Sequence, residues 1–131
     1  MQIRQGMLVL IFLLMTSSAI AEELFDGTKT LLCASVEAMD CVSGESCVRG
    51  LPEVIGAPQF LRIDFAGKKI IGPKHTTAIL KMEKEEGQIL LQGIELNMGW
   101  VFALNQTTGR FTATLADEEG AFVIFGACTP L

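Results

Sequence analysis

The sequence has little of what catalysis requires. It contains one histidine, His75, which follows Pro73 and Lys74 in a predicted loop. It has no G-x-S-x-G turn to hold a serine nucleophile. Its carboxylates gather at predicted hairpin ends, where they face water instead of forming a pair held in contrasting environments. We therefore expect a protein that is not an enzyme, with no catalytic residues and no cofactor.

Signals for metal and nucleic-acid binding are also lacking. The cysteines have no C-x2-C knuckle, the acidic runs do not match a calcium loop, and the glycines form no phosphate-binding loop. The chain has 10 Lys and Arg against 15 Asp and Glu. Its one basic cluster is Lys68 and Lys69 with Lys74. Nucleic acids and anionic membranes attract clustered cations, so we expect neither as a partner and no metal site.

The only long apolar run lies at the N-terminus. Arg4 is the one charged residue before Glu22, residues 7–15 are entirely apolar, and Ala19 and Ala21 are small residues placed for cleavage. This layout predicts a secretory signal peptide over residues 1–21. The apolar run is about half of the 20 residues that a membrane-spanning helix needs. We therefore expect a periplasmic or secreted domain over residues 22–131, with no stable membrane anchor after cleavage.

The four cysteines lie in the predicted exported part. An even number in an oxidising compartment indicates two disulfides, for which three connectivities exist. We favour Cys41–Cys47, which closes a short turn-rich stretch, together with Cys33–Cys128, which joins the two ends of the domain.

Turn signals and alternating side chains predict an all-β fold. Turns are expected at Gly67, Gly87, residues 105–109 and Gly120, each with a glycine that supplies a positive φ. Between them, apolar residues alternate with polar ones, as strands require. The predicted fold is a small antiparallel meander forming a barrel or sandwich of about seven to nine strands, preceded by a signal-peptide helix. The alternating segments are 61–65, 78–83, 100–104 and 111–115.

Two segments are apolar on both faces. Residues 121–125 and 89–91 lack the polar positions of a half-exposed strand, which predicts cover on both sides. The expected cover is the N-terminal segment, the loop over residues 51–58, or another subunit. Residues 30–41 suit a short helix or a strand, and we favour a strand.

Trp100 is the one residue singled out for binding. A tryptophan at a strand start, with Phe102 on the same side, would line a barrel mouth and contact an apolar ligand, or else fill the core. The first functional hypothesis is a non-catalytic binding module for a small apolar ligand. The alternative is a structural or protein-interaction protein of the periplasm or cell envelope, with its contact near residues 122–125.

Several short motifs accompany the cysteine layout: Pro58-Gln59-Phe60-Leu61-Arg62, Leu91-Gln92-Gly93, Trp100, Thr108-Gly109-Arg110 and Phe125-Gly126-Ala127-Cys128. In these motifs, most of residues 33–128 resembles small uncharacterised exported proteins of Gram-negative bacteria. The resemblance implies a periplasmic β protein with no assigned activity, and it supplies no catalytic residues.

Overall fold

The computed structural model describes residues 24–131, so the predicted signal peptide lies outside the described residues. The described chain is all-β and antiparallel, as predicted, with one short 3-10 helix. It has ten strands and not seven to nine, because three of them are only three residues long. The elements are β1 (Leu31–Val42), β2 (Val48–Gly50), η1 (Pro52–Ile55), β3 (Phe60–Asp64), β4 (Lys69–Ile71), β5 (Thr76–Ala78), β6 (Lys81–Glu85), β7 (Gln88–Glu95), β8 (Met98–Asn105), β9 (Arg110–Ala116) and β10 (Gly120–Pro130).

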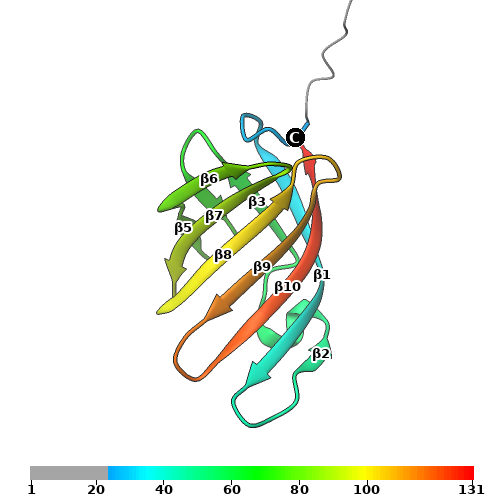
Figure 1. Ribbon diagram of the computed structural model, residues 1–131, viewed down its shortest axis with the longest axis vertical. Coiled ribbons are helices and arrows are strands. Elements are labelled where there is room, and N and C mark those ends of the chain that lie inside the picture. Colours follow the sequence, from blue (N-terminus) through cyan, green and yellow to red (C-terminus); the bar gives the residue numbers. More distant parts are fainter. Residues whose placement is uncertain (1–23) are drawn as a thin grey trace, which may run out of the picture.

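All ten strands belong to one sheet that curls into a half-barrel (Figure 1). Its order is β5-β4-β3-β1-β10-β9-β8-β7-β6, with β2 paired to β1 beside this path. The first and last long strands, β1 and β10, lie side by side at the centre and pair from Leu31 with Pro130 to Val42 with Gly120. In Figure 1, strands β7 to β10 are in front, and β3, β5 and η1 lie behind them.

Residues 30–41 form a strand, as favoured from the sequence. The helix propensity of this segment is overridden because β1 pairs with β10 on one side and with β2 and β3 on the other. A shift of register between Ser35 and Glu37 leaves Val36 as an extra residue, 65% exposed, at a β-bulge. Ser35 is buried beside it, and its hydroxyl has no hydrogen-bond partner.

The two edge strands of the sheet, β5 and β6, follow one another in the chain. The Ile79 amide donates to the Lys68 carbonyl at one edge (2.9 Å), and the Leu80 amide donates to the Gln92 carbonyl near the other (2.8 Å). β5 therefore pairs with β4, and the next strand, β6, pairs with β7 at the opposite edge. From the sequence, residues 78, 80 and 82 are expected to lie opposite residue 79. Ile79 is the buried residue of this segment, and Leu80 and Met82 are exposed.

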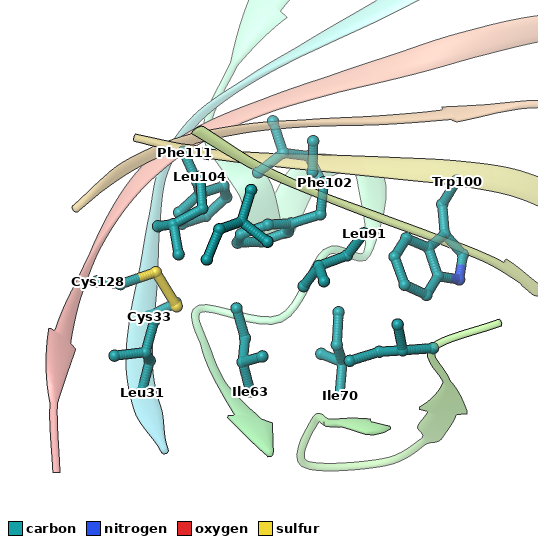
Figure 2. Packing of buried hydrophobic residues seen from close by; sticks show 14 of the residues in the cluster. Leu31, Cys33, Ile63, Ile70, Leu91, Trp100, Phe102, Leu104, Phe111 and Cys128 are labelled. Carbon is teal, nitrogen blue, oxygen red and sulfur yellow. A yellow bond between two sulfur atoms is a disulfide. The ribbon is translucent and has the colours of Figure 1, made fainter. Parts of the chain in front are cut away.

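Side chains fill the inside of the half-barrel (Figure 2). The other predicted alternations hold, since residues 61–65, 100–104 and 111–115 turn their large apolar side chains into this core. Phe25 closes one end, where its ring lies against Gly109. The loop that contains η1 packs Ile55 and Ala57 against the same core. The fully buried members with the largest side chains are Leu31, Ile63, Ile89, Leu91 and Leu104.

The turns follow the glycine prediction only in part. Gly87 (φ 79°) and Gly109 (φ 73°) have the expected left-handed backbone. At the β3–β4 turn, Lys68 (φ 52°) takes this conformation in place of Gly67, and Gly120 begins β10 instead of supplying a positive φ. Leu96 (φ 46°) and Asn97 (φ 64°) make the β7–β8 turn with no glycine at all, so its type could not be read from the usual residues.

Candidate interaction surface

Trp100 and Phe102, the residues predicted to contact a ligand, are both buried, at 6% and 3% exposure. The Trp100 indole Nε1 donates to the Thr77 hydroxyl (3.2 Å), which in turn donates to the Ile94 carbonyl (3.2 Å). The Phe102 ring stacks on Phe111 with centroids 4.4 Å apart. Figure 2 shows both side chains among other core residues. They occupy the position expected of core residues, and contact with a ligand stays a prediction.

The two disulfides connect as favoured from the sequence. Cys33–Cys128 joins β1 to β10 inside the core, and Cys41–Cys47 closes the loop between β1 and β2. All four cysteines are therefore bonded, with no free thiol in the chain. Two structural disulfides are typical of an oxidising compartment outside the cytosol.

Strands β7 to β10 present a second surface on the side away from the core. Their cross-strand pairs place alternate residues together on it, because side chains at positions i and i+2 of a strand share a face. We call this surface the outer face of β7–β10. It consists of Gln88, Leu90, Gln92, Ile94, Gly99, Val101, Ala103, Asn105, Arg110, Thr112, Thr114, Ala116, Ala121, Val123, Phe125 and Ala127.

The outer face of β7–β10 is neutral except at Arg110. Most of its residues are Ala, Val, Leu, Ile, Phe or Thr, although charged residues make up 19% of the chain. The charges lie around it: Asp117, Glu118 and Glu119 in the β9–β10 turn, and the Lys81–Glu83 ion pair (2.9 Å) on the edge strand β6. A solvated face of an antiparallel sheet usually carries charged and polar residues, so this composition is unusual for an uncovered face.

A shallow hollow of about 610 Å³ crosses this face. Its lining includes the small residues Ala103, Gly126 and Ala127 beside larger neighbours such as Phe125 and Arg110. Val36, the extra residue of the β1 bulge, bounds it. Its lining is thus apolar with one guanidinium and a few neutral polar groups. The full lining is Val36, Gln88, Ala103, Asn105, Arg110, Phe111, Thr112, Phe125, Gly126 and Ala127.

No described segment covers the outer face of β7–β10 (Figure 1). The loop over residues 51–58 was one expected cover, but Ile55 and Ala57 pack against the core instead. Of the N-terminal segment, Phe25 likewise belongs to the core cluster at one end of the half-barrel. Another subunit is therefore the one expected cover that the described residues do not test.

Chemistry-bearing groups do not converge elsewhere in residues 24–131. His75 is exposed, with its Nδ1 4.0 Å from a Glu95 carboxylate oxygen. No group of three His, Cys, Asp or Glu side chains in this part of the chain is placed to hold a metal ion. The helix in this part, η1, is four residues long, and none there has the length and hydropathy to span a membrane.

Comparison with family models, curated proteins and solved structures finds no significant match. The residues that sequence reasoning missed are the outward ones, such as Val101 and Thr112. They carry no reactive group, and the signal that could have found them was the two-sided apolar character of residues 121–125 and 89–91.

Proposed function

We propose that this protein is an exported, non-catalytic interaction module that binds another protein through the outer face of β7–β10. The observation that carries the proposal is the neutral, largely apolar composition of four adjacent strands on an acidic chain. Protein interfaces are depleted of charge at their centre and enriched in apolar and aromatic residues. The predicted signal peptide and the two disulfides support a periplasmic or secreted location.

The packed interior favours this function over the first hypothesis in its original form. A ligand inside the half-barrel would have to displace Trp100 and Phe102 from a core that includes fully buried Leu91 and Leu104. A ligand on the outside is a second candidate. The hollow over Ala103 and Phe125 is open to solvent, and its lining combines apolar and neutral polar groups with one cation, Arg110.

The proposal predicts that Val101→Glu abolishes the protein's contact with its partner. Val101 lies near the middle of the outer face and is 38% exposed, so a carboxylate there would be desolvated without a partner when the face is covered. In cells of the native host, crosslinking should trap the wild type in a protein adduct and trap the variant at least about 10-fold less. Val54→Glu is the matched control, because Val54 is 80% exposed on η1, away from the face.

Equal adduct yields from Val101→Glu and Val54→Glu would contradict the proposal. The intact native mass of the wild type purified from the same cells separates the two candidates. A mass increment of a few hundred daltons would favour the small ligand, and the mass of a second polypeptide would support the protein contact.

A further inference from the structure

We infer that the occupant of the outer face of β7–β10 is a second copy of this chain, packed sheet against sheet about a two-fold axis. This inference rests on the proposed function and names its partner. Closed two-fold dimers are the commonest protein assemblies, and in them one surface patch must be complementary to itself. The question is therefore whether this face suits a copy of itself in area, charge and orientation.

The area of the face is sufficient for a reversible dimer. Four strands spaced by about 4.8 Å, with about seven residues each rising roughly 3.3 Å, give a face of about 450 Å² in projection. A specific interface needs roughly 1,000 Å² in total, or about 500 Å² from each partner. Val36, which is 65% exposed, adds to the face at its β1 side. Because the sheet curls around the core, the outer face is convex and a copy contacts only part of it. The buried area therefore stays at the low end, which is typical of weak, reversible assemblies, and a weak dimer is expected in place of a permanent one.

The charge distribution favours a second copy on this face over any other face. The chain has a formal net charge of −5, so two copies repel each other in general. They can approach closely only where carboxylates are absent, and the outer face of β7–β10 has none. Glu37 on the adjacent β1 is paired with Arg49 (3.0 Å). A strongly basic partner would instead be drawn to the acidic turns around the face.

The ends of β9 fix the relative orientation of the two copies. Arg110 begins this strand, and the acidic turn of Asp117, Glu118 and Glu119 follows its end at Ala116. If the strands of the copies ran in the same direction, the two acidic turns would meet. An axis across the strands at Ala113 reverses the second copy and brings Arg110 beside the acidic turn of the partner subunit.

Glu118 is the best acidic counterpart of Arg110 in this arrangement. Asp117 is occupied within its own turn, where its carboxylate accepts from the amides of Glu119 (2.9 Å) and Gly120 (3.1 Å). Glu118 is exposed and follows it directly. By symmetry each dimer contains this Arg110–Glu118 contact twice, so a charge change at one position acts at two places.

Sedimentation velocity over a range of concentrations tests the inference on the purified wild type. We expect a reversible monomer–dimer equilibrium that Val101→Glu abolishes and Val54→Glu leaves unchanged. Arg110→Glu and Glu118→Lys should each raise the dissociation constant about 10-fold, and the double variant Arg110→Glu with Glu118→Lys should restore it to within about 3-fold of the wild type. The effect of the single variants should weaken as salt is added.

Unfolding curves of each variant should show that the fold is kept, since all four positions are exposed on the monomer. A wild type that stays monomeric at every concentration would overturn the self-association. In that case, a crosslinked adduct to a different protein that is lost in Val101→Glu would still support the proposed function. A dimer whose dissociation constant is unchanged in Val101→Glu would show that this face is not the dimer interface. A dimer that the charge exchange fails to restore would overturn the reversed orientation.

Discussion

Replacing Cys33 and Cys128 together by alanine should lower the free energy of unfolding by about 4–5 kcal/mol. The bond links residues 95 positions apart, so its removal frees nearly the whole domain in the unfolded state. It also lies in the core, where Cys33 is fully buried between Leu31 and Phe111 in Figure 2. Urea unfolding followed by Trp100 fluorescence, with the Cys41–Cys47 disulfide intact in both proteins, measures the difference.

The second disulfide provides the matched control. Cys41–Cys47 spans only six positions, and its replacement by alanine should cost about 2 kcal/mol in the same loop-entropy argument. The essential result is which of the two replacements lowers the free energy of unfolding more. Equal losses, or a larger loss for the short loop, would contradict the role given to Cys33–Cys128 as the link between the first and last strands.

Gly126→Ala is expected to have the next largest effect, a loss of about 3 kcal/mol. A methyl group at this position would overlap the carbonyl oxygen of Ala34 on β1 and meet the Phe111 ring at 2.5 Å. The carbonyl belongs to a strand paired on both sides and cannot move aside, so β10 would have to shift against β1. The measurement is the shift of the urea midpoint at constant slope.

Gly50→Ala tests whether the Gly126 effect is steric. Gly50 also lies in a strand paired with β1, but no atom comes within 4 Å of a methyl group added there. This variant should stay within about 0.5 kcal/mol of the wild type. Similar losses for the two variants would mean that the close contact at Gly126 does not determine stability.

The parts of the fold that depend on local patterns were predictable from the sequence. Residues 111–115 alternate strictly, and their apolar side chains lie inside as expected. The short loop between Cys41 and Cys47 identified one disulfide, and the second followed by elimination. The alternation over residues 78–82 did not show which side is buried, because a period of two contains no information about a segment that changes partners between Ile79 and Leu80.

The candidate surface was harder to predict for a physical reason. Sequence reasoning selected Trp100 by its chemical type, and the fold buries that ring against Thr77 and the core. Outward residues such as Val101, Ala103 and Thr112 have no distinctive chemistry, and they form a surface only when β7 to β10 are paired in register. The bulge at Val36, which bounds the hollow, depends on the pairing of β1 with β10.

Methyl NMR spectra of the wild type, recorded from low micromolar to millimolar protein, test the central claim most directly. Val101 and Ala103 point to the outer face, whereas Leu104 on the same strand points into the core. If a second copy covers the outer face of β7–β10, the methyl signals of Val101 and Ala103 shift with concentration and that of Leu104 stays fixed. Shifts at Leu104 with none at Val101 and Ala103 would contradict the account.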